Sequence, residues 1–423
     1  MQADLRIEHE LLAIGSEHDV WCMLELAAPE APVDRERRPL ALALVIDRSG
    51  SMAGRKLAVT RASARFLAER LAPADRLAVV TYDDEIELRV PLAAVGTDRR
   101  GLCEAIERIH PGGSTNLSGG YLKGVEVLGA APPDALRRVL LLSDGLANVG
   151  ITAPDALRDF AARAREATGI TTSTIGLGAD FDEDLMTAMA DAGGGNAHFA
   201  ESPDDAPGIF GREFTDLVSV VAQNLSVEIR PEPPVASLDV LNDFPIVPVE
   251  GGVQAQLGDA YGGERRRVVF GLHVPDLTAL GPRRIAEVVL RYVSVGERIA
   301  HHELRMPVVV NLVSADEAAT AVPDATVREE VLILQAGRAG KRARELADAG
   351  DLEAAHLLLE DAARQLERAA PGSPRAQDLL EQAEFWGARS HLLASGAYDA
   401  LERKRLTYRS RESGRGRKRR PEP

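Results

Sequence analysis

Apolar runs that predict buried strands alternate with amphipathic helical patterns from about residue 38 to residue 222. The strand-like runs are "PLALALVID", "DRLAVVTYDD", "RRVLLLSDG" and "ITTSTIGLG". A helical pattern at about 55–71 follows the first run, and one that begins with Pro154 in its first turn follows the third. This alternation is typical of an α/β fold with a doubly wound, mostly parallel sheet that is covered by helices on both faces.

The hydrophobic period changes to two at about 225–313, where short strand-like runs are separated by Gly and Pro turns. This spacing predicts an antiparallel β-sandwich. Residues 5–27 also alternate loosely and are followed by a linker at 28–39 that is rich in proline and charge. We expect the N-terminal strands to pair with strands after 225, so that the α/β unit is inserted into the sandwich.

The remaining chain reads as a helical segment at about 324–400 and a basic tail from Arg403 onward. One pair of helices in the segment faintly resembles a tetratricopeptide unit, a repeat that normally needs neighbours. The tail has almost no apolar content and is predicted to be disordered. The expected divisions are N-terminal strands at 1–37, the α/β domain at 38–222, the sandwich at 223–315, helices at 316–402 and the tail at 403–423.

Composition narrows the class of protein. The net charge of −15 disfavours nucleic-acid binding by the body of the chain. The basic tail is first of all a solvated arm, and its alternative partners are nucleic acid, anionic lipid, an acidic protein or the acidic body of this chain. Cys22 and Cys103 are too few for a disulfide framework, so we expect reduced core residues. The N-terminus lacks the apolar core of an export signal, and no run approaches the roughly 20 apolar residues of a membrane span. These features predict a soluble, cytoplasmic protein without a transmembrane segment.

Oxygen-bearing side chains occur in three loops of the α/β unit. Asp47, Ser49 and Ser51 follow the first strand directly, Thr115 precedes a helix in "GGSTN", and Asp144 ends the buried run "LLLSD". In a doubly wound sheet, the carboxyl ends of adjacent central strands converge at the point where ligands bind. We therefore expect the two aspartates to meet there, with the threonine above them.

Two carboxylates and three hydroxyls form a hard, all-oxygen ligand set that suits Mg²⁺, Mn²⁺ or Ca²⁺ and does not suit zinc or copper. The alternation of Asp47, Ser49 and Ser51 allows a tight loop to direct three side chains to one side, and Gly50 permits the turn. Two carboxylates roughly balance the charge of a dication, which would still attract one further anionic oxygen. The competing interpretation of each loop alone is a turn and helix cap.

The runs "DRSGS", "GGSTNLSGG" and "LLLSDG" resemble the metal-ion-dependent adhesion site of the von Willebrand factor type A family. The resemblance covers about 38–222 and implies a doubly wound sheet with one antiparallel edge strand. It implies that Asp47, Ser49, Ser51, Thr115 and Asp144 hold the metal and that a carboxylate of a partner protein completes the coordination. Ser114 competes with its neighbour as a ligand. The flanking strands resemble inter-alpha-trypsin inhibitor heavy chains and bacterial proteins labelled calcium-activated chloride channel proteins.

These residues favour a protein-binding scaffold over an enzyme. A metal-dependent phosphoester hydrolase with Asp47 as nucleophile is the enzymatic alternative. Ser49 stands where such phosphatases have a second aspartate, Lys56 lies a helical turn or more away, and no His or Cys lies near the loops in sequence. A third reading is an adaptor for an AAA+ ATPase, although the chain has no phosphate-binding motif G-x-x-x-x-G-K-[ST] of its own.

An acidic run and an aromatic pair are each interpreted as structural features and not as binding sites. The run "DFDED" at 180–184 resembles the start of a calcium loop but lacks the required glycine and glutamate, so it predicts a helix N-terminus. The aromatic pair Phe385 and Trp386 lies in the helical segment and is expected to pack in its core.

Overall fold

The computed structural model describes residues 1–31, 38–295 and 299–418. Half of the predicted linker (32–37) and the last residues of the predicted tail (419–423) lie outside these ranges. The chain divides into two compact units. One comprises Pro32–Val220 with Val295–Glu297, and the other comprises Met1–Ala31, Val221–Ser294 and Arg298–Pro423. Among the described residues, no helix combines the length and the apolar character needed to span a membrane.

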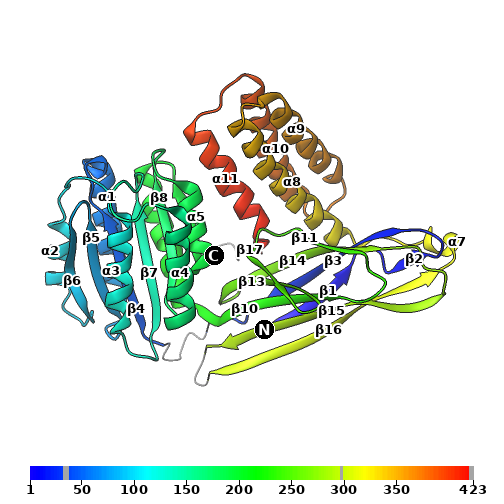
Figure 1. The fold of residues 1–423 in the computed structure, drawn as a ribbon, viewed down its shortest axis with the longest axis horizontal. Coiled ribbons are helices and arrows are strands. Elements are labelled where there is room, and N and C mark those ends of the chain that lie inside the picture. Colours follow the sequence, from blue (N-terminus) through cyan, green and yellow to red (C-terminus); the bar gives the residue numbers. More distant parts are fainter. Residues whose placement is uncertain (32–37, 296–298, 419–423) are drawn as a thin grey trace. The chain divides into compact units, whose positions relative to one another are not determined.

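The first unit is built on a sheet with strand order β6-β5-β4-β7-β8-β9 (Figure 1). Neighbouring strands are parallel except for the antiparallel pair of β5 with the edge strand β6. The predicted doubly wound, mostly parallel sheet is thus confirmed. The strands are β4 (Leu40–Asp47), β5 (Arg76–Tyr82), β6 (Ile86–Ala94), β7 (Leu136–Ser143), β8 (Thr171–Leu177) and β9 (Gly194–Ala200).

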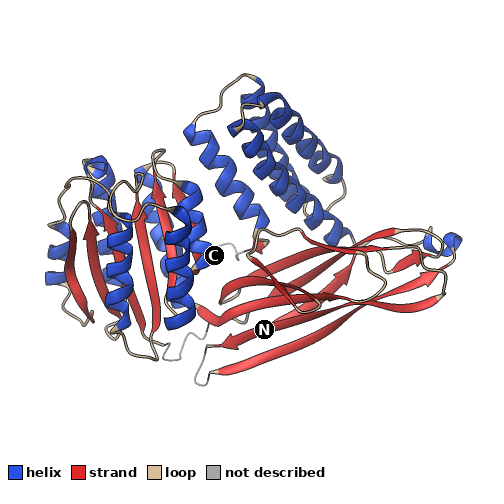
Figure 2. Ribbon diagram, in the orientation of Figure 1, coloured by secondary structure: helices blue, strands red, loops and turns tan. Residues whose placement is uncertain are grey.

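Helices cover both faces of this sheet (Figure 2). Packing contacts group α1 with α2 and α6, and α3 with α4 and α5, so each group covers one face. Every residue of β4 is buried, as expected for a central strand covered on both sides. Asp182 accepts a hydrogen bond from the Leu185 N–H at the start of α5, which confirms the helix N-terminus predicted at 180–184. The helices are α1 (Arg55–Arg70), α2 (Arg100–Glu107), α3 (Leu117–Gly129), α4 (Pro154–Thr168), α5 (Glu183–Ala192) and α6 (Ala206–Val218), with short 3-10 turns η1 (Gly50–Met52) and η2 (Pro203–Asp205).

A charged cluster lies within the core of this unit, around Glu213 of α6. The Glu213 carboxylate is fully buried and accepts hydrogen bonds from His198 Nε2 at 2.8 Å and Asn196 Nδ2 at 3.0 Å. The Arg138 guanidinium lies 3.5 Å from it. Burial acts to raise the pKa of Glu213, but the hydrogen bond and charge of His198 and the charge of Arg138 outweigh it and hold the pKa well below its usual value. The cluster therefore stabilises the ionised carboxylate.

The second unit contains a sandwich of two sheets. One has the order β1-β3-β14-β11, with β17 also paired to β14, and the other has the order β12-β13-β10-β15-β16-β2. Because β3 pairs antiparallel with β14 and β2 pairs with β16, the N-terminal strands complete the sandwich as predicted. The strands are β1 (Gln2–Ile7), β2 (Leu11–Ala13), β3 (His18–Ala27), β10 (Val220–Pro231), β11 (Ser237–Val240), β12 (Ile246–Val249), β13 (Gly252–Tyr261), β14 (Arg265–Val274), β15 (Gly281–Ser294), β16 (Ala300–Val313) and β17 (Arg417–Lys418).

The sandwich core is aliphatic with few aromatic rings, in keeping with the composition. Cys22 of β3 is completely buried in this core, and burial raises the pKa of its thiol well above the usual value. Both cysteines were expected in the core. Cys22 is buried there, whereas Cys103 of α2 in the first unit is partly exposed.

The C-terminal helices belong to the same compact unit as the sandwich and do not form a separate domain. The prediction of a disordered tail from Arg403 was wrong for residues 403–414, which lie in α11. Arg403 pairs with Asp348 at 3.1 Å and Leu406 is fully buried, so charges that look solvated in the sequence have partners on other helices. Trp386 is fully buried, as predicted. The helices are α7 (Ala315–Ala318), α8 (Ala325–Asp348), α9 (Leu352–Ala369), α10 (Ala376–Ala394) and α11 (Ala400–Gly414).

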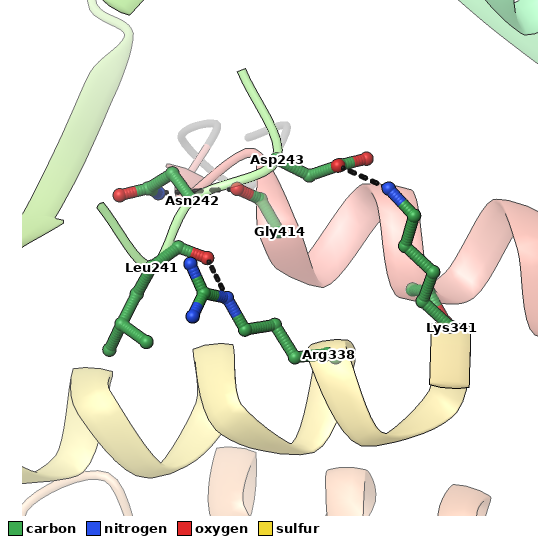
Figure 3. Close-up of a pocket in the computed structure, with 8 residues that line it drawn as sticks. Leu241, Asn242, Asp243, Arg338, Lys341 and Gly414 are labelled. Atoms are coloured by element: carbon green, nitrogen blue, oxygen red, sulfur yellow. Dashed lines mark hydrogen bonds and ion pairs between the residues drawn. The ribbon is translucent and has the colours of Figure 1, made fainter. Parts of the chain in front are cut away.

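Polar contacts join the sandwich to these helices around a cavity of about 200 Å³ (Figure 3). Arg338 of α8 donates to the Leu241 carbonyl at 3.0 Å, and Lys341 pairs with Asp243 at 2.9 Å. The Asn242 side-chain amide donates to the Gly414 carbonyl at 3.2 Å. These bonds hold the segment after β11 against α8 and α11.

Candidate metal centre

Asp47 is the last residue of β4 and is completely buried. Its Oδ1 accepts a hydrogen bond from the Ser49 N–H at 2.8 Å, and its Oδ2 accepts one from the Ser143 hydroxyl at 3.0 Å. The first bond turns the chain sharply after the strand, and the second links β4 to the end of the neighbouring strand β7. Both carboxylate oxygens are therefore fixed in position.

The two serines connect the first loop to Asp144, which directly follows β7. Ser51 Oγ donates to Asp144 Oδ1 at 2.7 Å, and the hydroxyls of Ser49 and Ser51 lie 3.1 Å apart. Asp144 is fully buried and Ser49 nearly so, whereas Ser51 is exposed. The group is thus anchored in the sheet and reaches solvent on the Ser51 side.

Thr115 completes the group from the loop before α3. A methyl group placed on Gly145 would lie 3.6 Å from Ser51 Oγ and 3.8 Å from Thr115 Oγ1, so these two hydroxyls lie beside the same point. The Thr115 N–H donates to Asn148 Oδ1 at 2.8 Å, which ties this loop to the segment after β7. The structure brings together all five residues singled out in the sequence. Ser114, the competing candidate, is exposed and donates its N–H to Asp84.

The loop that carries Thr115 is held by an aspartate that the sequence reasoning missed. Asp83, directly after β5, accepts hydrogen bonds from the N–H groups of Glu85 and Gly113 and pairs with Arg48 at 3.1 Å. A Cβ on Gly112 would lie 1.6 Å from Asp83 Oδ2, so a larger residue would force the Asp83 carboxylate or the loop to shift. The signal was present in the acidic turn that follows the strand next to β4.

Comparison with known proteins identifies the family of the domain that carries the site. The model of the von Willebrand factor type A domain matches residues 41–212. These residues form a von Willebrand factor type A (vWA) domain. Protein sll0103 of Synechocystis is 27% identical over 354 residues, which is 81% of this chain and 82% of that protein. Human inter-alpha-trypsin inhibitor heavy chain H4 is 29% identical over 163 residues, which is 36% of this chain and 17% of that protein.

A solved structure shares the fold of both units. The von Willebrand factor type A protein from Catenulispora acidiphila gives a TM-score of 0.70 at 18% identity, over 99% of this chain and 97% of that one. The strands and helices that flank the vWA domain therefore have counterparts in that protein.

Lys56 of α1 reaches the centre of the site. Its Nζ lies 2.5 Å from Asp144 Oδ2, and its side chain is 24% exposed. The expectation that this lysine lies too far along the helix to act at the loops was wrong, because the first turn of α1 faces them. No spacing rule in a single sequence points to this contact, which depends on how the helix packs on the sheet.

The electrostatics of the vWA site favour a bound cation. Burial raises the pKa of Asp47 to about 6, and the nearby charge of Asp144 acts in the same direction. Hydrogen bonds from Ser49 and Ser143 oppose the rise. Positive charge beside the two aspartates would offset this cost, and Lys56 supplies part of it.

The donor set fits a hard divalent cation. Among the residues that the structure describes, no group of three or more His, Cys, Asp or Glu side chains could hold a metal. A metal at the vWA site would thus depend on hydroxyl oxygens together with its two carboxylates. Such neutral and anionic oxygens suit Mg²⁺, Mn²⁺ or Ca²⁺.

Proposed function

We propose that the vWA domain is a metal-dependent module that binds a partner protein. Asp47, Ser49, Ser51, Thr115 and Asp144 would hold a divalent cation, most simply Mg²⁺, with Mn²⁺ or Ca²⁺ as alternatives. When bound, the cation would offer positive charge to an Asp or Glu carboxylate of the partner. The observation that carries the proposal is the convergence of these five oxygen side chains from three loops, which follow β4, precede α3 and follow β7.

Binding is a better account of the site than catalysis. Domains of this family are commonly protein-interaction modules. The hydrolase alternative needs Asp47 as a nucleophile, but its carboxylate is fully buried and both of its oxygens accept hydrogen bonds. The exposed member of the group, Ser51, lies where a partner could approach.

An adaptor role for an AAA+ ATPase is a narrower form of the same proposal. It requires that the partner be the motor or one of its substrates. Capture of an AAA+ protein in the experiment below would support it, and capture of other partners alone would contradict it.

The experiment is affinity capture from a lysate of the source organism with the immobilised full chain, in Mg²⁺ and in EDTA. The variant Asp144→Ala removes a ligand, and Asp155→Ala on the exposed surface of α4 is the matched control, with a side chain 88% exposed. We expect partners that are lost in EDTA and with Asp144→Ala but are retained with Asp155→Ala. Partners that persist in EDTA and with Asp144→Ala would contradict the proposal, provided that thermal unfolding shows both variants to be folded.

A further inference from the structure

A second candidate site lies in the other unit, in a cavity of about 520 Å³. The start of α8, the end of α9 and the loop to α10 enclose it, and these helices lie side by side (Figure 1). Its apolar lining includes Leu332, Ala369 and Pro371, and its charged lining is Arg328, Glu329 and Arg368. The volume is in the range of small-molecule sites.

Glu329 supplies a buried acceptor that the described part of the chain leaves without a donor. Glu329 is 5% exposed. Ser373 Oγ donates to Oε1 at 2.6 Å, but Oε2 has no hydrogen-bond partner among the described residues. A carboxylate accepts several hydrogen bonds, so the Glu329 side chain keeps capacity for a further donor beside Ser373.

The next residue shows how the same helix satisfies a buried glutamate. Glu330 is 2% exposed and accepts from Arg267 at 2.7 Å and from Arg375 at 2.6 Å. Two guanidinium groups thus compensate one buried carboxylate, while its neighbour Glu329 has a single hydroxyl. Of these two neighbouring glutamates, the less compensated one, Glu329, is the one that lines the cavity.

Arg328 and Arg368 provide the opposite charge at the same cavity. Both residues are exposed, and neither side chain has a hydrogen-bond or ion-pair partner within the described ranges. Guanidinium groups bind carboxylates well because their paired N–H donors match the two oxygens. The cavity therefore presents an acceptor for a cation and donors for an anion, with apolar surface as well.

We infer that this cavity binds a basic α-amino acid, such as L-arginine or L-lysine. The ammonium or guanidinium of the ligand's side chain donates to the Glu329 carboxylate, and its α-carboxylate binds Arg328 and Arg368. Its aliphatic stem packs against Leu332 and Pro371. The same chemistry occurs in a free amino acid and in the C-terminal residue of a peptide. The inference does not depend on the metal site.

The test is isothermal titration calorimetry of the full chain with L-arginine, L-lysine and the tripeptide Ala-Ala-Arg. Agmatine lacks the carboxylate and L-citrulline lacks the side-chain charge. We expect each of these two to bind at least about tenfold more weakly than L-arginine. Binding of L-arginine but not of the tripeptide assigns the site to a free amino acid, and tight binding of the tripeptide assigns it to a peptide terminus.

Variants of the chain locate the binding. Glu329→Gln should weaken L-arginine by about tenfold or more, while Glu353→Gln, on the exposed first turn of α9, should leave it unchanged. Arg368→Ala, at an exposed position, should weaken L-arginine and leave agmatine unchanged. The inference is overturned if no probe binds at millimolar concentration, if Glu329→Gln binds L-arginine as tightly as the wild type, or if agmatine matches L-arginine.

Discussion

Replacing Lys56 should tighten the binding of a divalent cation at the vWA site. Lys56 Nζ lies 2.5 Å from Asp144 Oδ2, and Asp144 is fully buried. Because Asp144 is one of the proposed ligands, the ammonium and a metal ion compete for the same carboxylate. The variant Lys56→Met removes the competing charge and keeps a side chain of similar length.

The magnitude follows from the strength of this contact. A hydrogen bond between charged groups contributes about 1.5–3 kcal/mol. Because about 1.4 kcal/mol corresponds to a factor of ten, the metal affinity should rise roughly 10- to 100-fold. The same change leaves the buried Asp144 without its cation when no metal is bound, so the metal-free protein should lose roughly the same 1.5–3 kcal/mol of stability. The unfolding temperature in EDTA should therefore fall, and saturating metal should restore it.

The assay is Mn²⁺ titration by calorimetry at fixed ionic strength, together with thermal unfolding in EDTA and in Mn²⁺. Lys123→Met is the matched control, because Lys123 forms a 2.9 Å pair with Glu126 on the surface of α3. The control should change neither quantity appreciably. Unchanged or weaker Mn²⁺ binding by a folded Lys56→Met protein would refute the competition.

Three further predictions concern the vWA domain. Gly112→Ala should lower Mn²⁺ affinity by about tenfold or more, because its Cβ would lie 1.6 Å from Asp83 Oδ2 and displace the Thr115 loop; Gly129→Ala has open space and should not. Glu213→Gln should lower the free energy of unfolding in urea by about 3–5 kcal/mol, since it removes the buried anion that faces Arg138 and His198, and a loss below about 1 kcal/mol would contradict this. The pKa of Glu213 lies well below its usual 4.5, so its contribution to stability is complete above pH 4.5 and is lost as the pH falls below that value. The wild type should therefore lose stability below pH 4.5 more steeply than Glu213→Gln in urea titrations at several pH values.

Much of the first unit could be predicted because local patterns agree with the tertiary structure. The run Leu40–Asp47 is apolar throughout, and a strand buried on both faces has this pattern. Asp47 and Asp144 end adjacent parallel strands, so topology alone brings them to the same edge of the sheet. The positions of the five candidate ligands follow from these two facts and from the helix that begins after Thr115.

Other features depend on partners that are distant in the chain. The charges of α11 looked solvated in the sequence, but Glu402 lies 3.1 Å from Arg389 of α10, and Arg403 pairs with Asp348 of α8. Lys56 was set aside because it lies a helical turn or more beyond the first loop in the sequence. That distance along the chain says little about distance in the fold, where its Nζ lies 2.5 Å from Asp144 Oδ2. The unpartnered oxygen of Glu329 is visible only once the surrounding side chains are placed.

The most direct test of the proposed function is Mn²⁺ binding to the wild-type chain and to Asp47→Asn, Ser49→Ala, Ser51→Ala, Thr115→Ala and Asp144→Asn. Calorimetry with Asp155→Asn as the control would measure each affinity. We predict that the wild type and the control each have one high-affinity Mn²⁺ site. Both aspartate variants should lose Mn²⁺ binding, and the three hydroxyl variants should bind Mn²⁺ more weakly. A wild-type chain that binds no Mn²⁺, or aspartate variants that bind it as tightly as the wild type, would contradict the account.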